Sequence, residues 1–275
     1  MGIKKCIIPV AGLGSRFLPI SSVFPKELMP VKGLPILQHG VKETIDAGLK
    51  DISIIVSPGK EIIKNYFSPE KNKTLTDRNL LKHKSIQDLI FLMNQVKLNY
   101  VTQHQPRGLG HAISLMQNYL KEDESFAVIL PDDLCSYEDL NLLSEMVKLS
   151  EEFRGFCILA VEKIPKNMTN QYGIVDLGDE IHKNSHLSIY NVKDIVEKPA
   201  SEEAPSDFGV IGRYILPNDI FNKISSKQLG YNNEIQITDA IKHYATEGRL
   251  IAITSTVRRF DCGTLQGYSD AVTNF

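Results

Sequence analysis

Residues 4–19 read KKCIIPVAGLGSRFLP, an apolar run that leads directly into a glycine-rich turn. The run from Lys4 to Val10 contains β-branched residues and predicts a buried strand. The glycines of the following AGLGSR segment, residues 11–16, let backbone N–H groups approach phosphate oxygens without obstruction by side chains. The segment therefore favours phosphate binding, although it also suits a plain tight turn. It lacks the Lys-Ser/Thr ending of a P-loop, and Phe17 occupies the third-glycine position of a dinucleotide fingerprint, so neither an NTPase nor a dehydrogenase is favoured.

Strands and helices alternate along the chain after this turn. In segment 36–48, Leu37, Val41 and Ile45 lie on one stripe of a helix that Gly48 is placed to end. Strands are predicted at 52–57, 97–102 and 126–130, and helices at 36–48, 60–67, 75–93 and 109–120. This order is typical of parallel strands joined by crossover helices, and it predicts an α/β fold with a Rossmann-like, doubly wound sheet.

The second half of the chain, from about residue 156, is richer in strands. We predict strands at 156–162, 173–176, 188–197 and 209–216, and closing helices at 234–246 and 265–275. Asn233 is placed to cap the first of these helices, whose Ile237, Ile241 and Tyr244 form a buried stripe. The strands are expected to form a mixed sheet over the carboxyl ends of the first strands, where open α/β sheets place ligands. No repeat or linker separates the halves, so we expect one domain over residues 1–275, with halves 1–155 and 156–275.

The composition excludes several classes of function. The 275 residues include 31 Lys and Arg against 33 Asp and Glu, a formal net charge of −2, so no bulk charge attracts nucleic acid or an acidic membrane surface. The apolar run at 6–10 is too short for a secretory segment or a membrane span. The four cysteines, Cys6, Cys135, Cys157 and Cys262, contain no C-x-x-C pair, which argues against a zinc site or a disulfide framework. We therefore expect a cytoplasmic protein with reduced thiols that binds neither nucleic acid nor membranes.

Two cations follow the glycine-rich turn. Arg16 and Lys26, the latter within Pro25-Lys26-Glu27, belong to the same loop, and prolines at 19 and 25 stiffen it. A triphosphate carries about four negative charges near neutrality, and these two side chains are suited to hold it and the charge that develops during phosphoryl or nucleotidyl transfer. The alternative is that both are solvated surface cations.

Two aspartates stand where carboxylates can share a metal ion. Asp132 comes just after the apolar strand 126–130, at the carboxyl edge of the predicted sheet, and Asp261 lies in a Phe-Asp-Cys-Gly turn much later. Mg²⁺ takes hard oxygen ligands and usually binds through one or two carboxylates plus substrate phosphates. Asp133 would point to the opposite face of an extended chain, so we choose Asp132 over its neighbour. The alternative is that each aspartate only caps a turn.

Three further side chains suit a sugar phosphate and a base. Glu197 can accept hydrogen bonds from sugar hydroxyls and Lys198 can meet a phosphate, unless the two form an exposed ion pair at a strand end. The amide of Gln103 offers the donor and the acceptor that a uracil edge needs, unless it is an ordinary surface side chain. His104 and His111 accompany no Ser or Cys nucleophile signature, so we interpret both as structural.

The motifs together resemble those of bacterial UTP:glucose-1-phosphate uridylyltransferases, members of the sugar nucleotidyltransferase family. Single motifs of this length are weak signals, but eight or more in one order along nearly the whole chain are specific. The resemblance rests on AGLGSRFLP from residue 11, PKE from 25, Gln103 with GLGHA from 108, FAVILPDD from 126, YGI from 172, VEKP from 196, EAPS from 203, VIGRYIL from 210, EIQITDA from 234 and FDCG from 260.

The resemblance implies a nucleotide-diphospho-sugar transferase fold and the joining of UTP to glucose 1-phosphate, with UDP-glucose and pyrophosphate as products. Residues 1–155 would form the nucleotide-binding half, and residues 156–275 the sugar-binding half and the C-terminal helices. Relatives of this kind commonly form homodimers or homotetramers, and we expect one of these. The resemblance assigns Mg²⁺ to Asp132 and Asp261, the nucleotide to Ala11, Gly12, Gly14, Gln103 and Gly108, the sugar to Gly173 and Glu197, and charge neutralisation during transfer to Arg16, Lys26 and Lys198.

Two positions depart from the family pattern, each through the loss of a positive charge. Ser22 stands where a lysine usually follows the RFLP motif, and Thr102 replaces the arginine that usually precedes the base-reading glutamine. Catalytic rate, nucleotide affinity or regulation are expected to differ as a result. A related transferase that accepts dTTP or another hexose 1-phosphate is one alternative, because the residues that determine the pocket are few. A weakly active paralogue that binds nucleotide sugars and regulates a partner subunit is another.

Overall fold

The computed structural model describes residues 2–68, 80–136, 140–225 and 229–275. Its strands are β1 Lys5–Pro9, β2 Pro30–Val31, β3 Leu34–Pro35, β4 Asp51–Val56, β5 Lys97–Thr102, β6 Phe126–Ile129, β7 Asp133–Cys135, β8 Cys157–Lys163, β9 Gly173–Lys183, β10 Leu187–Glu197, β11 Phe208–Leu216, β12 Leu250–Ser255 and β13 Arg259–Asp261. Its α-helices are α1 Ile36–Asp46, α2 Glu61–Tyr66, α3 Lys84–Met93, α4 Leu109–Ser114, α5 Leu142–Glu152, α6 Ile220–Lys223, α7 Ile237–Thr246 and α8 Leu265–Asn274. Within these ranges, no helix is long and apolar enough to cross a lipid bilayer.

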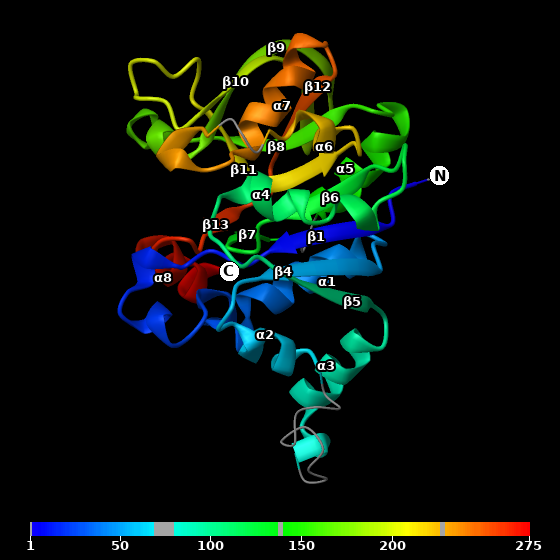
Figure 1. The fold of residues 1–275 in the computed structure, drawn as a ribbon, viewed down its shortest axis with the longest axis vertical. Coiled ribbons are helices and arrows are strands. Elements are labelled where there is room, and N and C mark those ends of the chain that lie inside the picture. Colours follow the sequence, from blue (N-terminus) through cyan, green and yellow to red (C-terminus); the bar gives the residue numbers. More distant parts are fainter. Residues whose placement is uncertain (1, 69–79, 137–139, 226–228) are drawn as a thin grey trace.

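Among the described residues, one nine-stranded sheet connects both halves of the chain, in the order β5-β4-β1-β6-β11-β8-β12-β10-β9 (Figure 1). The first four strands are parallel, and β11 runs antiparallel to both β6 and β8. The predicted α/β fold with a Rossmann-like mixed sheet is thus confirmed. The second half does not form a sheet over the carboxyl ends of the first strands, however. It extends the same sheet sideways, because β11 pairs with the edge of β6 and satisfies backbone groups that would otherwise be unpaired.

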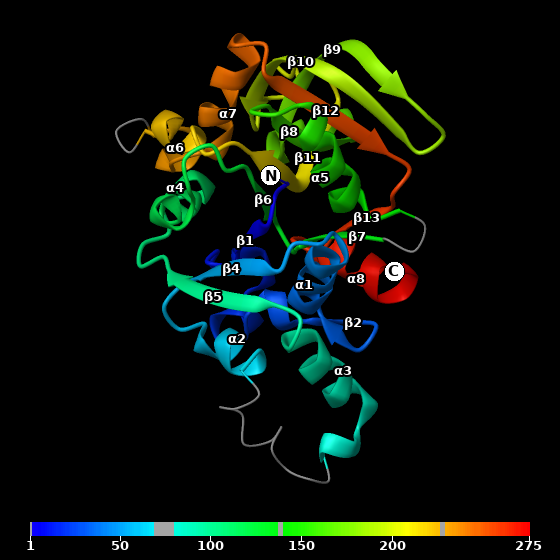
Figure 2. The same ribbon diagram turned by 90° about the vertical axis from the view of Figure 1, so that its right-hand side faces the viewer.

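Apolar residues on alternate faces of the strands explain why helices cover both sides of the sheet. In β1, Cys6 and Ile8 belong to one core cluster and Ile7 belongs to the other. Helices α1, α2, α3 and α5 contribute to the first cluster, and α4, α6 and α7 contribute to the second (Figure 2). The predicted buried stripe of α1 is confirmed, since Leu37 and Val41 are fully buried.

The C-terminal segment returns to the first half of the chain. β13 pairs antiparallel with β7, so that Asp261 lies opposite Asp133. Helix α8 begins with a side-chain cap, in which Thr264 accepts a hydrogen bond from the N–H of Gly267. This segment packs on Val31 and its neighbours through Phe260 and other buried residues. The pairing places a late turn of the sequence beside the end of β6.

Several predicted boundaries are wrong. α4 ends at Ser114 rather than at 120, where the Ser114 hydroxyl donates to the carbonyl of His111. Helix α7 begins at 237 rather than at 234, because Asn233 lies in a turn with φ of 58° and does not cap the helix. β9 extends to 183, and the elements α5, β12 and β13 were not predicted. α3 covers the second half of the helix predicted at 75–93, whereas 75–79 lie outside the described residues.

Candidate active site

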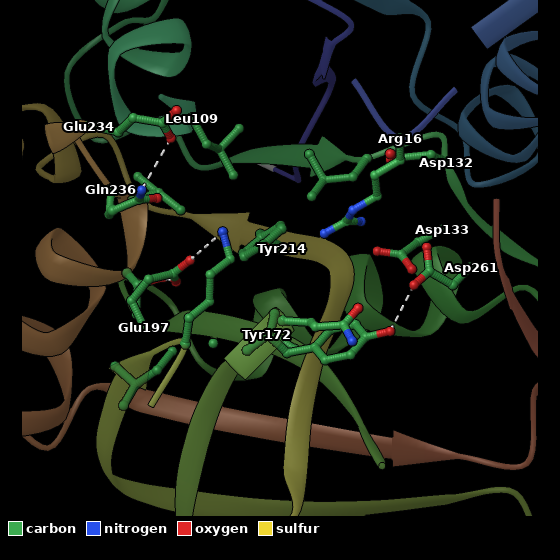
Figure 3. Close-up of a pocket in the computed structure, with 18 residues that line it drawn as sticks. Arg16, Leu109, Asp132, Asp133, Tyr172, Glu197, Tyr214, Glu234, Gln236 and Asp261 are labelled. Atoms are coloured by element: carbon green, nitrogen blue, oxygen red, sulfur yellow. Dashed lines mark hydrogen bonds and ion pairs between the residues drawn. The ribbon is translucent and has the colours of Figure 1, made fainter. Parts of the chain in front are cut away.

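A cleft is lined by residues from both halves of the chain (Figure 3). Six of the predicted site residues line it, namely Arg16, Asp132, Gly173, Glu197, Lys198 and Asp261. They come from the turn after β1, the turn after β6, the start of β9, the end of β10 and the end of β13. The other six lie in the first half of the chain and do not line this cleft, namely Ala11, Gly12, Gly14, Lys26, Gln103 and Gly108.

The two predicted metal ligands lie side by side. A methyl group built on Gly263 would stand 2.9 Å from Asp261 Oδ1 and 3.2 Å from Asp132 Oδ2, so both oxygens border the same small space. The Cys262 N–H donates to the Asp132 carbonyl at 2.7 Å, which joins the two turns. Residue 263 must therefore be small for the two carboxylates to face each other. Among the described residues, no group of three or more His, Cys, Asp and Glu side chains is arranged to hold a metal ion.

Two cations accompany this carboxylate pair. Lys26 Nζ donates to Asp132 Oδ2 at 2.6 Å, and Arg16 extends toward the same space (Figure 3). Burial alone would lower the pKa of Lys26, but the negative charge of Asp132 outweighs it and holds the pKa above its ordinary value. Burial would likewise raise the pKa of Asp132, but the ammonium of Lys26 reverses this shift and keeps the carboxyl ionised.

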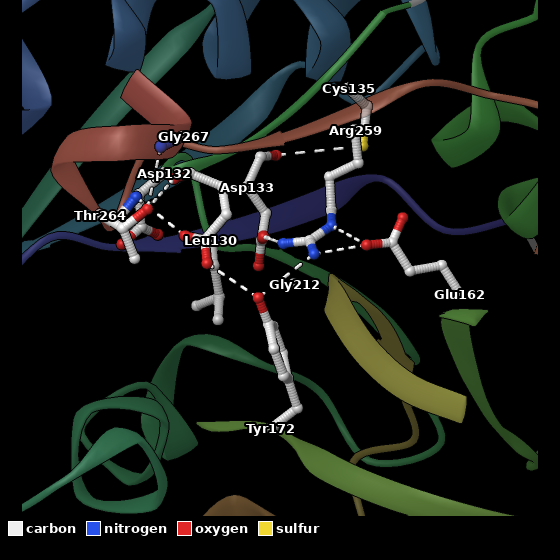
Figure 4. A network of polar contacts seen from close by, with 12 residues as sticks. Leu130, Asp132, Asp133, Cys135, Glu162, Tyr172, Gly212, Arg259, Thr264 and Gly267 are labelled. Carbon is white, nitrogen blue, oxygen red and sulfur yellow. Dashed lines mark hydrogen bonds and ion pairs between the residues drawn. The ribbon is translucent and has the colours of Figure 1, made fainter. Parts of the chain in front are cut away.

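Asp133 also lines the cleft and belongs to a network of polar contacts with Arg259 (Figure 4). Its carboxylate accepts a hydrogen bond from Arg259, which also binds Glu162. Burial raises the pKa of Asp133 to about 6 despite the Arg259 charge. Arg259 Nη2 donates to the Tyr172 hydroxyl at 3.3 Å, and that hydroxyl donates to Asp261 Oδ2 at 2.8 Å. Asp132 and Asp133 thus have different partners. The contacts from Arg259 through the Tyr172 hydroxyl orient the carboxylate of Asp261.

The opposite end of the cleft contains Glu197 and Lys198. Glu197 Oε2 accepts a hydrogen bond from Thr238 Oγ1 at 2.5 Å, and its Oε1 lies 3.4 Å from Lys198 Nζ. The ammonium of Lys198 also lies 5.2 Å from the centre of the Tyr231 ring. A methyl group at Gly173 would stand 3.4 Å from both Glu197 Oε2 and Thr238 Oγ1, so the glycine keeps this end of the cleft open. One carboxylate oxygen of Glu197 is therefore fixed by α7 while the other faces Lys198.

Gln103 and Gly108 lie together at the carboxyl end of β5. Gln103 is 5% exposed, and its Nε2 donates to the Gly108 carbonyl at 3.2 Å and to His111 Nδ1 at 2.9 Å. Burial lowers the pKa of His111, so its ring is neutral near pH 7 and can accept this bond. Gly108 has φ of 95°, and a methyl group there would stand 2.7 Å from the Ile235 carbonyl oxygen. Only glycine fits this close approach between the two halves.

Two carboxylates thus stand at one end of the cleft, and a carboxylate and a lysine stand at the other. Residues 5–275 match the nucleotidyl transferase family. The chain belongs to that family.

Several relatives of this nucleotidyl transferase have a more specific name. The chain is 42% identical over 274 residues to the UTP–glucose-1-phosphate uridylyltransferase of Pseudomonas aeruginosa PAO1, and the alignment covers 99% of this chain and 95% of the relative. It is 34% identical over 275 residues to the enzyme of that name from Bacillus subtilis 168, covering 99% and 91%. A solved UDP-glucose pyrophosphorylase in complex with UDP-glucose superposes with a TM-score of 0.87 at 38% identity, covering 98% and 97%. A UTP-bound enzyme from Acinetobacter baumannii superposes at 0.85 with 34% identity, covering 98% and 92%.

Sequence reasoning missed several residues that orient the site of this nucleotidyl transferase. Thr238 contacts the predicted site residue Glu197 across 41 residues of sequence, and Arg259 reaches the predicted site residue Asp261 through the Tyr172 hydroxyl. Thr238 lies within the EIQITDA motif and Arg259 directly precedes the FDCG motif, but the motifs do not indicate these contacts. His111 was interpreted as structural, and the structure places it against the Gln103 amide.

Proposed function

We propose that this nucleotidyl transferase joins UTP to glucose 1-phosphate and releases pyrophosphate and UDP-glucose. The observation that carries the proposal is the cleft itself. It has the Asp132 and Asp261 carboxylates at one end and Glu197 with Lys198 at the other, which suits a phosphate–metal centre beside a sugar site. The 42% identity to an enzyme with this printed activity over nearly the whole chain supports the same substrates.

We assign Mg²⁺ to Asp132 and Asp261. Their oxygens border one space, Asp132 stays ionised beside Lys26, and Asp261 is oriented by the Gly263 N–H and the Tyr172 hydroxyl. Hard carboxylate oxygens of this kind suit Mg²⁺, with the remaining ligands supplied by water and phosphate oxygens. When bound, the ion would supply charge neutralisation on the phosphates of both substrates.

The remaining chemistry is alignment. The phosphate of glucose 1-phosphate is mostly dianionic at pH 7, because such second pKa values lie near about 6, so its oxygen can attack without a protein base. The new bond forms to the α-phosphorus of UTP, and the bond from that phosphorus to the bridging oxygen breaks, so that pyrophosphate leaves with the electron pair. Arg16, Lys26 and Lys198 hold the phosphates and neutralise charge in the transition state.

We assign the nucleoside to the first half of the chain. The Nε2 of Gln103 is already engaged by Gly108 and His111, which fixes the amide and leaves its Oε1 to accept from the N–H of a uracil ring. Backbone groups of Ala11, Gly12, Gly14 and Gly108 complete this assignment, because these positions present backbone without bulky side chains.

The deciding experiment measures pyrophosphate release by the purified chain with UTP, glucose 1-phosphate and MgCl₂. Sustained turnover that stops with EDTA and resumes with excess MgCl₂ is expected. The same assay with dTTP and with other hexose 1-phosphates tests for a related transferase of different preference. No turnover, together with UDP-glucose binding, would favour the regulatory paralogue, which the charge losses at Ser22 and Thr102 keep as the alternative.

Replacing Thr238 with valine is expected to weaken the sugar site selectively. Valine keeps the shape of the side chain but removes the hydroxyl that holds Glu197 Oε2. Loss of a hydrogen bond to a charged group costs roughly 1.5–3 kcal/mol, so the KM for glucose 1-phosphate should rise at least tenfold. The KM for UTP should stay within about twofold. Initial-rate kinetics measure both values.

Thr246→Val is the matched control, because Thr246 lies on the same helix with an exposed hydroxyl that bonds only within the helix. It should leave both KM values unchanged. An equal rise in both KM values for Thr238→Val would mean that the hydroxyl does not act on the sugar site.

We further propose a cytoplasmic enzyme that forms a homodimer or homotetramer. All four cysteines are free and buried, which suits a reducing compartment. The oligomeric state is proposed from the family resemblance, and light scattering of the purified chain measures it directly. We also retain residues 1–275 as one domain, a proposal that the continuous sheet supports.

A further inference from the structure

Lys60 lies directly beneath the glycine-rich turn, at the residue before α2. Its ammonium donates to the carbonyl oxygens of Val10 at 2.6 Å and Gly12 at 2.7 Å. It also contacts both carboxylate oxygens of Glu27 at 2.9 Å. The Lys60 side chain is 12% exposed and that of Glu27 is 3% exposed. One buried ammonium thus joins the end of β1, the glycine-rich turn and the segment that contains Lys26.

The two carbonyl contacts fix the direction of the neighbouring amide groups. The peptide bonds that follow Val10 and Gly12 are trans, so the N–H groups of Ala11 and Leu13 point away from the carbonyls that Lys60 binds. Among the described residues, no acceptor binds the N–H of Ala11, Gly12 or Leu13. A methyl group at Gly12 would meet no atom within 4 Å, so this face of the turn is open. The turn therefore presents free backbone donors on the side opposite Lys60.

Glu27 explains how an ammonium is retained at this buried position. Burial lowers the pKa of Lys60 and raises that of Glu27, and the attraction between the two charges opposes both shifts. The carboxylate compensates the buried charge, and among the described residues its hydrogen bonds go to Lys60 rather than to the side chains or backbone of the turn. Its role can therefore be separated from that of Lys60 by substitution.

We propose that Lys60 is a positioning residue for the nucleotide, because it holds the Val10 and Gly12 carbonyls so that the turn directs its free N–H groups toward the bound UTP. This inference rests on the proposed function, which places the nucleotide at the glycine-rich turn. Lys60 lies outside the predicted motifs. It would orient backbone donors that the glycines alone leave flexible.

The test measures UTP binding by calorimetry in the presence of MgCl₂, for the wild-type chain and for Lys60→Met. The variant should bind UTP about tenfold or more weakly, because the donors lose their fixed orientation, while kcat at saturating UTP and the KM for glucose 1-phosphate stay within about threefold. Lys148→Met, at an exposed i,i+3 ion pair on α5, is the control and should bind UTP as the wild type does.

A double variant, Lys60→Met with Glu27→Gln, separates positioning from stability. Lys60→Met alone leaves the Glu27 carboxylate buried without a partner and should lower the melting temperature, whereas the double variant removes the unpaired charge and should recover it. UTP binding should stay weak in the double variant. Recovery of wild-type UTP affinity together with stability would overturn the proposal. A wild-type chain that binds dTTP but not UTP would contradict the proposed substrate instead, and the same variants would then be compared with dTTP.

Discussion

Asp132→Asn is expected to lower UDP-glucose formation by at least about 100-fold, since changes in residues that only support metal ligands already cost roughly 10–100-fold. The substitution keeps the size of the side chain but removes the negative charge that faces Asp261 across the space beside Gly263. It should also raise the MgCl₂ concentration needed for half-maximal rate. Pyrophosphate release at a series of MgCl₂ concentrations measures both effects.

Two further variants show whether the metal or the ion pair causes this loss. Lys26→Met removes the 2.6 Å ion pair that keeps Asp132 ionised, so any rise in its MgCl₂ requirement should disappear as the pH is raised, whereas that of Asp132→Asn should persist. Asp46→Asn, at an exposed i,i+4 pair on α1, should behave as the wild type. Near-normal turnover of Asp132→Asn at low MgCl₂ would remove the metal assignment.

Glu43→Ala is expected to lower the free energy of unfolding by about 3–5 kcal/mol, the usual cost when a buried ion pair loses one partner. Arg213 Nε and Nη2 donate to the two oxygens of Glu43 at 2.8 and 2.7 Å, and the two side chains are 1% and 2% exposed. The pair joins α1 to β11, so the substitution leaves a cation inside the core without a counter-charge. Urea unfolding followed by circular dichroism measures the change.

A variant that removes both charges shows whether the loss of stability comes from the unpaired charge or from the loss of packing. Glu43→Leu combined with Arg213→Met should recover most of the lost stability, because apolar residues of similar volume often replace a buried pair without loss. Glu145→Ala, which breaks an exposed pair with Lys148, should cost less than about 1 kcal/mol. A loss for Glu43→Ala as small as that would show that water reaches Arg213.

The sequence predicted the parallel strands of the first half well, because β4 and β6 are largely apolar runs that lie between amphipathic helices. The strand at 97–102 has the predicted bounds, and the stripe of Ile237, Ile241 and Tyr244 is buried as expected. The extension of β9 to Lys183 was missed because its last residues are charged and exposed, a pattern that suits an edge strand but resembles a loop. Leu250–Ser255 has the pattern of a buried strand and had no predicted element.

The candidate site was predictable in its residue types but not in its geometry. The glycine-rich turn and the order of motifs named the residues, and the cleft brings six of them together. Lys60, Thr238 and Arg259 act across the fold, so no local spacing marks them. Asn233 is a prediction from local sequence that was wrong. Its capping preference predicted a helix N-cap, but its φ of 58° is not that of an N-cap residue.

The position of β11 between β6 and β8 has a mechanical consequence. The turn that follows β6 contains Asp132, and Glu197 lies at the end of β10 in the same sheet, with β11, β8 and β12 between these two strands. Rotation of one half against the other would break the β6–β11 ladder, so it does not offer a cheap route to a wider cleft. We expect the turns at the rim of the cleft to adapt to substrates of different length. The distance between the Asp132 end and the Glu197 end of the cleft should then stay nearly constant.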